Sequence, residues 1–303
     1  MSRLRALAEL LRISLAPTVV ADLCAGVALY GGGAGGGAAV LRLAAIPLLL
    51  FCGGMALNGW VDREEDRVSR PRRPLPSGAI APGFALALAV VALIAAPAVA
   101  AIAGRTHARD VAAWTAGLAA AIALYHTPLK KSSLAGPLLL GAIRGGDLLL
   151  GAVGVAGIGP GVAAAWPAAL VYGAYVAGAS GVAHEEDRAP RMGRVRVAVL
   201  LAFAAIALNG GLAWLRADGA TQLPIVIVLM AAWHGWKIKA ALHLLRPGAP
   251  GMAPLAAYAG LLLAGMPLLP AVAAFGAAAP DLGLIAFAAF WVVFALVRIV
   301  PPT

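Results

Sequence analysis

The sequence predicts an all-α protein, a polytopic transmembrane helical bundle that forms a single domain over residues 1–303. Three observations support this prediction. Hydrophobic residues make up 62% of the 303 residues and charged residues only 12%, and the mean hydropathy is +0.91, which is typical of a multi-span membrane protein. Ala, Gly and Leu dominate the chain, as expected where helices pack closely in lipid through small residues. The longest polar stretch is residues 58–78, so no soluble domain is inserted.

The apolar residues gather into ten segments that are long enough, or nearly long enough, to cross a bilayer. These segments lie at 14–30, 39–59, 79–104, 110–126, 134–157, 164–184, 195–215, 222–242, 252–275 and 281–300. With ten spans, the connections alternate between the two sides of the membrane.

The positive charges favour one orientation of this bundle. Most of the 23 Lys and Arg residues fall on one side when the N-terminus is inside, and Lys and Arg accumulate in cytoplasmic loops. We therefore expect an integral, multi-pass protein of a bacterial-type inner (plasma) membrane, with the N-terminus and the 58–78 stretch in the cytoplasm. The formal charge of +10 then reflects topology and contact with anionic membrane lipids, and no nucleic acid is expected as a partner.

The second segment ends in a set of oxygen-bearing side chains. Asn58, Asp62 and Asp66 are spaced i, i+4 and i+8, which places all three on one face of a helix. Magnesium ions prefer one or two carboxylates and take their remaining ligands from water and phosphate. This helix end is therefore a candidate Mg²⁺ site.

A stiff basic loop follows the acidic face directly. It contains Arg70, Arg72 and Arg73, and Arg side chains bind phosphate groups through paired hydrogen bonds. Pro71, Pro74 and Pro76 keep the loop out of a helix. The spacing predicts a diphosphate site beside the metal. The alternative is a set of solvated charges at the membrane edge. It is less favoured, because the spacing of the acids, the prolines and the arginines all agree with one binding site.

Two further groups of polar residues allow both a functional and a structural interpretation. Tyr125 and Lys130 close the fourth segment. Lys130 either contacts a diphosphate or is an ordinary cytoplasmic cation, and Tyr125 either lines a cavity or is an interfacial aromatic. Arg144 and Asp147 lie inside the fifth segment, where ionisable residues are costly. They either form a structural ion pair or lie on a cavity wall, where Arg144 reaches a phosphate.

A second acidic cluster closes the sixth segment. Glu185, Glu186 and Asp187 are followed by Arg188, which repeats the order of carboxylates and arginines in the first cluster. Two such clusters would hold metal ions around a diphosphate; the alternative is a run of solvated charges beside the membrane, because this run alone has little specificity. The five histidines show no paired metal-ligand spacing, so zinc is not expected.

These residues resemble the UbiA superfamily of intramembrane prenyltransferases, and the resemblance covers most of the chain. The family's first motif is Asn-Asp-x-x-Asp-x-x-x-Asp followed by Arg-Pro-x-Pro-Ser-Gly. Asn58, Asp62 and Asp66 match its first part, and residues 73–78 (RPLPSG) match its second part completely. Residues 125–130 resemble the family's Tyr-x-x-x-x-Lys step.

The chain also departs from the family pattern. Gly59 replaces an Asp that often follows the Asn. In the second motif, Asp-x-x-x-Asp, Glu185 takes the first position, Asp187 an intermediate one and Ala189 the last. The pattern looks more like a divergent bacterial, EboC-like branch, whose fifth helix tends to carry a run such as residues 144–147 (RGGD). The superfamily has nine helices, so the resemblance implies nine to ten spans around a central apolar cavity.

The resemblance implies a Mg²⁺-dependent prenyltransferase that ionises a prenyl diphosphate donor and transfers the prenyl group to a small, unidentified acceptor. The implied metal ligands are Asn58, Asp62, Asp66, Glu185 and Asp187. The implied donor-binding residues are Arg73, Lys130, Arg70 and Arg188, and the implied catalytic residues are Asp62, Asp66, Arg144 and Tyr125. A terpene cyclase of the same family, which uses the same ionisation without an acceptor, is an alternative. A non-catalytic membrane transporter or assembly protein is a more distant one.

Overall fold

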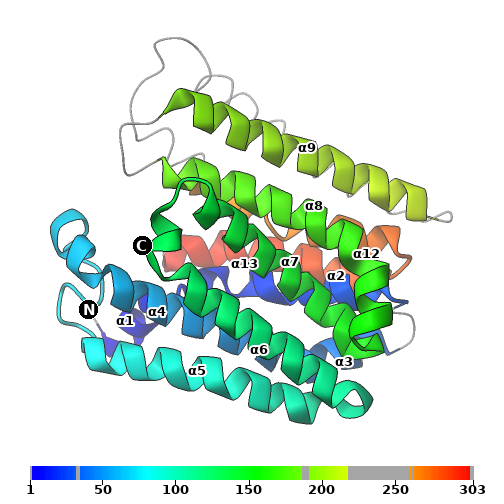
Figure 1. The fold of residues 1–303 in the computed structure, drawn as a ribbon, viewed down its shortest axis with the longest axis horizontal. Coiled ribbons are helices and arrows are strands. Elements are labelled where there is room, and N and C mark those ends of the chain that lie inside the picture. The colour runs from blue at the N-terminus through cyan, green and yellow to red at the C-terminus, as the bar shows by residue number, and fades with distance from the viewer. Residues whose placement is uncertain (1, 32–34, 186–190, 218–258, 261, 301–303) are drawn as a thin grey trace.

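The structure is a computed structural model, and it describes residues 2–31, 35–185, 191–217, 259, 260 and 262–300. The described part is built from helices joined by short connections (Figure 1). In chain order the helices are α1 Arg3–Leu10, η1 Ile13–Leu15, α2 Pro17–Leu29, α3 Gly36–Leu43, α4 Ala45–Ser69, α5 Pro82–Ala103, η2 Arg105–His107, α6 Ala108–Tyr125, η3 Pro128–Lys131, α7 Ala135–Ala156, α8 Ile158–His184, α9 Met192–Arg216, α12 Leu268–Gly276 and α13 Pro280–Ile299. The prediction of an all-α membrane bundle is confirmed.

Within the described residues, six helices are long and apolar enough to cross a membrane, and a seventh span results if the bent pair Arg3–Leu10 and Ile13–Leu29 is one span. The predicted segment 110–126 forms α6, which is not among them. The predicted segment 222–242 and the first residues of 252–275 lie outside the described residues, and the rest of 252–275 contributes the shorter apolar helix Leu262–Gly276. The count of nine to ten spans therefore stays a prediction.

The second predicted segment, 39–59, is longer and more divided than expected. It begins within α3, and α4 continues through the acidic face to Ser69. The helix ends there because Arg70 precedes Pro71, and a residue before proline is pushed out of the helical region. Arg70 accordingly has φ −143° and ψ 62°. The acidic face is thus fully helical, as the i, i+4, i+8 spacing predicted.

Close backbone contacts join α2, α7 and α8. A Cβ atom on Gly26 of α2 would overlap the carbonyl oxygen of Leu148 in α7, and one on Gly141 of α7 would overlap the carbonyl oxygen of Gly173 in α8. Only glycine fits at these two positions, as is common where membrane helices pack tightly. The contacts allow side chains of all three helices to meet in one buried cluster.

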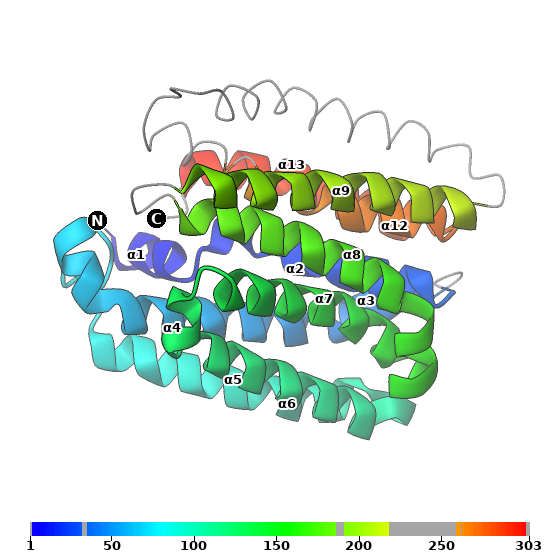
Figure 2. The same cartoon turned by 45° about the horizontal axis from the view of Figure 1, so that its top comes forward.

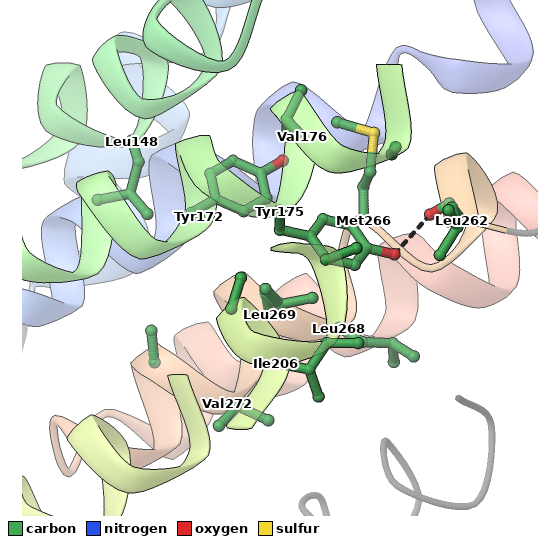
Figure 3. Close-up of a cluster of buried hydrophobic side chains, with 14 of the residues drawn as sticks. Leu148, Tyr172, Tyr175, Val176, Ile206, Leu262, Met266, Leu268, Leu269 and Val272 are labelled. Atoms are coloured by element: carbon green, nitrogen blue, oxygen red, sulfur yellow. Dashed lines mark hydrogen bonds between the residues drawn. The ribbon is translucent and has the colours of Figure 1, made fainter. Parts of the chain in front are cut away.

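An apolar core fills the space between α8, α9, α12 and α13 (Figure 3). Tyr172 and Tyr175 of α8 are almost completely buried. The Tyr175 hydroxyl donates a hydrogen bond of 2.7 Å to the carbonyl oxygen of Leu262. A buried hydroxyl needs such a partner, and here it ties α8 to the segment before α12.

The ends of several helices meet at one end of the bundle, where α4 ends and α7 begins, close to α1 (Figure 2). We call it the Asp62 end and define it by Asn58, Asp62, Arg73 and Lys130. These residues come from α4, from the loop after α4 and from η3. The fold therefore brings the two sequence motifs that were 72 residues apart, at Asn58 and Lys130, to one place.

Candidate active site

Lys130 joins the two motifs at the Asp62 end. Its Nζ donates hydrogen bonds to both carboxylate oxygens of Asp62 and, at 2.9 Å, to Oδ1 of Asn58. The Nδ2 of Asn58 in turn donates to Asp62 at 3.1 Å. Charge-assisted hydrogen bonds of this kind are among the stronger ones in proteins. Lys130, a predicted diphosphate contact, thus holds Asn58 and Asp62, which are two of the predicted metal ligands.

Asp66 and Arg73 form a second pair of the same kind. The Nη1 of Arg73 donates to both carboxylate oxygens of Asp66, at 2.9 and 2.8 Å. The side chains are only 11% and 5% exposed. The Nε of Arg73 is buried and has no hydrogen-bond partner among the described residues. Because buried donors are normally paired, this nitrogen has spare capacity for an anionic oxygen.

A small cavity of about 20 Å³ lies beside these pairs, with Asn58, Asp66, Arg73 and Arg12 in its wall. Sequence reasoning missed Arg12 as a site residue and used it only for topology. Arg12 occupies the break between α1 and η1 in a left-handed conformation, with φ 45°. Burial, followed by the charges of Arg73 and Arg70, lowers the pKa of Arg12 to about 10. An anion bound among these arginines would relieve their mutual repulsion.

The replacement of the family's Asp by Gly59 has a packing explanation. A Cβ atom on Gly59 would stand 2.7 Å from Cδ1 of Leu10 in α1. Leu10 belongs to a small apolar cluster with Leu75 and Ile80. A side chain at position 59 would therefore have to displace the end of the Leu10 side chain.

A larger cavity of about 260 Å³ extends from the Asp62 end between the helices. Apolar side chains of α4, α6, α7 and α8 form most of its wall, and Arg12, Tyr125 and His126 lie at its Asp62 end. Arg144 and Asp147 lie deeper, in the middle of α7. A mainly apolar cavity with a few polar groups is the usual form of a ligand site. Tyr125, Arg144 and Asp147 thus all line this cavity.

Arg144 is nevertheless engaged in a buried cluster. Its Nη2 lies 2.7 Å from Oδ2 of Asp22 in α2 and donates to the hydroxyl of Tyr172 in α8 at 3.0 Å. Asp147 is farther away, with Oδ2 3.9 Å from Nη1. The structure thus combines both interpretations, since Arg144 is an ion-pair partner on the cavity wall. Sequence reasoning missed Asp22, although an acidic residue inside an apolar span is itself a signal.

The second acidic cluster is described only at its first residue. Glu185 is 4% exposed, and its carboxylate accepts a hydrogen bond of 2.9 Å from the backbone N–H of Arg191. It also lies 3.6 Å from Arg194. Glu185 thus links the end of α8 to the start of α9. The predicted residues Asp187 and Arg188 lie outside the described part of the chain.

The donor chemistry at the Asp62 end fits Mg²⁺. Asn58, Asp62 and Asp66 present an amide and two carboxylates, and Mg²⁺ needs only one or two carboxylates when water and phosphate complete its shell. Among the described residues no three His, Cys, Asp or Glu side chains lie together as a metal site. The fit therefore depends on oxygen atoms that a phosphorylated ligand supplies.

The fold and this site together define a multi-pass integral membrane protein, with charged residues at the mouth of an apolar cavity inside the bundle. The sequence profile of the UbiA prenyltransferase family matches residues 14–246. The chain therefore belongs to the UbiA prenyltransferase family, as its motifs indicated.

Three similar proteins are each named digeranylgeranylglyceryl phosphate synthase. The one from Halobacterium salinarum is 41% identical over 76 residues, which cover 25% of this chain and 28% of the relative. The one from Methanothrix thermoacetophila is 52% identical over 48 residues, 16% and 18% of the two chains. The one from Ignicoccus hospitalis is 32% identical over 154 residues, 51% and 48%. The chain thus spans at most about half the length of these relatives.

A solved structure of a digeranylgeranylglyceryl phosphate synthase has the same fold. The TM-score is 0.59 at 20% sequence identity, and the match covers 91% of this chain and 99% of that chain. The assignment to a divergent bacterial branch is not tested by these comparisons and stays a prediction.

Proposed function

We propose that this protein is an intramembrane prenyltransferase that binds a prenyl diphosphate at the Asp62 end and transfers the prenyl group to an acceptor. The observation that carries the proposal is the pairing of acids and bases beside the apolar cavity. Asp62 is paired with Lys130 and Asp66 with Arg73. A diphosphate with its metal ion offers both members of each pair a new partner, while the cavity accepts the prenyl tail.

The basic residues perform the first task, which is to hold the diphosphate. In the proposed complex, the diphosphate oxygens replace the carboxylates as partners of Lys130 and Arg73. The same oxygens contact Arg12 and so reduce its repulsion with Arg73. Arg70 and Arg188 are proposed as additional contacts from the neighbouring loops. Fixed positive charges directed at a leaving group stabilise the charge that develops on it. The bond between C1 and the diphosphate oxygen then breaks, and the electron pair leaves with the diphosphate.

Asn58, Asp62 and Asp66 are proposed to hold Mg²⁺, with Asp187 and Glu185 as candidates for further ligands. When bound there, Mg²⁺ would withdraw negative charge from the leaving diphosphate. The apolar wall of the cavity would keep water away from the allylic cation. The aromatic ring of Tyr125 would lie beside that cation. We place this end of the bundle in the cytoplasm, where prenyl diphosphates are soluble.

The names of the relatives suggest a class of acceptor. Digeranylgeranylglyceryl phosphate contains two prenyl groups on glyceryl phosphate, so a lipid that carries one prenyl group and a free hydroxyl is the natural acceptor for the second. We therefore propose an amphiphilic alcohol as acceptor and geranylgeranylglyceryl phosphate as the first compound to test. Its phosphate and its prenyl chain suit a site with charges at the mouth and apolar walls inside.

The test is diphosphate release by the protein purified in detergent. Geranyl, farnesyl and geranylgeranyl diphosphate are supplied with or without geranylgeranylglyceryl phosphate, in Mg²⁺ or in EDTA. We expect release that requires Mg²⁺ and falls at least about a hundredfold in Asp62→Asn. Glu64→Gln is the matched control, because Glu64 is an exposed acid of the same helix that pairs with the neighbouring Arg63 and Arg67.

The products, weighed by mass spectrometry, separate the alternatives. A coupled ether supports the transferase. A cyclic hydrocarbon formed without acceptor would identify a terpene cyclase instead. If no donor releases diphosphate, even with added lipid extract, the enzyme proposal fails and a non-catalytic membrane protein becomes the better explanation.

A further inference from the structure

His126 lines the large cavity, and one of its ring nitrogens has no hydrogen-bond partner among the described residues. The residue follows α6 directly and lines the cavity near its Asp62 end. Its ring packs edge-on against the ring of Tyr125, with 5.1 Å between the centroids. Burial lowers the pKa of the His126 ring, and the charges of Lys130 and Asp62 also act on that pKa. His126 therefore lies where the head of a bound prenyl diphosphate would meet its tail.

The hydrogen bond at the other nitrogen determines the form of the ring. Nδ1 of His126 lies 2.8 Å from the carbonyl oxygen of Ile122. A carbonyl oxygen can only accept, so Nδ1 carries the proton. In a neutral imidazole the other nitrogen, Nε2, then has a free lone pair. The carbonyl group at the end of α6 thus orients the ring and selects its tautomer.

Nε2 itself is buried and has no hydrogen-bond partner among the described residues. Leaving a buried acceptor unpaired is destabilising, and such atoms are uncommon in folded proteins. The hydrogen bond from Nδ1 to Ile122 is sufficient to hold the ring in place, so a purely structural role does not explain why a second polar atom, Nε2, is buried. An unpaired lone pair on a residue that lines the cavity points to a ligand that donates a hydrogen bond.

We infer that His126 is the general base of the transfer, an inference that rests on the proposed function. The acceptor hydroxyl donates its hydrogen bond to Nε2. As the C1–diphosphate bond breaks, the hydroxyl oxygen forms a bond to C1 and its proton moves to Nε2. The imidazolium then returns the proton to the released diphosphate or to water. Positioned bases of this kind contribute roughly 10²- to 10⁴-fold to a rate.

The kinetic test compares two products of one ionisation. In His126→Gln and His126→Phe we expect coupled ether to fall roughly a hundredfold, while diphosphate release falls much less, because the cation is lost to water or to elimination. Imidazole added to His126→Ala should restore part of the coupling. His107→Gln is the matched control, since His107 lies before α6 at its other end. Coupling and release that fall together, with no rescue, would overturn the inference.

A spectroscopic test does not depend on turnover. In protein labelled with ¹⁵N-histidine, the His126 signals are assigned by their loss in His126→Gln. We expect a neutral ring protonated at Nδ1, with an Nε2 resonance that shifts when geranylgeranylglyceryl phosphate is added. The deoxy analogue, which lacks the hydroxyl, should give no such shift. A ring protonated at Nε2, or equal shifts with both compounds, would refute the role of His126 even if the enzyme is active. If the wild type is inactive but the expected shifts appear, the proposed function fails, while the hydrogen bond from the hydroxyl of the added lipid to Nε2 is supported.

Discussion

Two clusters of opposite charges, one at the Asp62 end and one in the middle of the bundle, differ in what holds them. At the Asp62 end, the side chains of Lys130 and Asp62 are 18% and 16% exposed. Deeper in the bundle, Arg144 and Asp22 are 7% and 0% exposed, and backbone contacts at glycines fix the helices around them. The Lys130–Asp62 pair reaches water and can exchange its partners for a ligand. The second cannot do so without moving a helix.

This difference shows that similar ion pairs have different roles at different depths in the bundle. Near water, breaking a pair costs little because solvent replaces the lost partner. In a dry interior, removing one member leaves an uncompensated charge, which is strongly destabilising. We therefore assign binding of the donor to the Asp62 end and attachment of α2 to α7 to the deep cluster. The following predictions test that division, beginning with the largest effect.

Asp22→Asn should destabilise the protein by about 3–5 kcal/mol, because it leaves the buried charge of Arg144 without its nearest carboxylate. Reversible unfolding in mixed detergent micelles measures this loss. The double variant Asp22→Leu with Arg144→Met should recover most of it, since apolar replacement of a whole buried pair is often neutral. Equal stability of the wild type and Asp22→Asn would show that the pair does not hold the helices.

Lys130→Gln, in contrast to Asp22→Asn, should have a large effect on activity and a small effect on stability. We expect diphosphate release to fall about a hundredfold, since a cation directed at the leaving group is lost. The melting temperature should change by no more than a few degrees, because Asp62 keeps its contact with Asn58 and with water. A loss of stability comparable to that of Asp22→Asn would remove the distinction between the two clusters.

Gly26→Ala should cost about 1–3 kcal/mol of stability, because its methyl group would push α7 away from α2. Gly117→Ala in α6 is the matched control, as a Cβ there meets nothing within 4 Å, and alanine favours a helix by about 1 kcal/mol over glycine. The two unfolding free energies should therefore change in opposite directions. If both variants are destabilised equally, close packing is not what places Asp22 beside Arg144.

Asp147→Leu should change the stability least, by less than about 1 kcal/mol. Its Oδ1 is buried without a hydrogen-bond partner among the described residues, and replacing an unsatisfied polar group by an apolar one of similar shape is nearly neutral. The same unfolding measurement serves here. A loss as large as that of Asp22→Asn would mean that Arg144 depends on both carboxylates.

The sequence alone determined much of the fold and of the Asp62 end. Composition and apolar segments predicted a helical membrane bundle, because burying a helix in lipid demands a long apolar run. The spacing of Asn58, Asp62 and Asp66 predicted one helical face, because helix geometry is local. Pro71 likewise predicted where that helix would end.

Only the tertiary structure decided which groups meet. No local rule connects Asp22 with Arg144, or Lys130 with Asp62, since each pair joins distant parts of the chain through the packing of whole helices. The same holds for Arg12 and His126. Their residue types were visible in the sequence, but their roles follow from the cavity that they line. Spacing along a helix is set by the backbone, whereas proximity across a bundle depends on every contact between its helices.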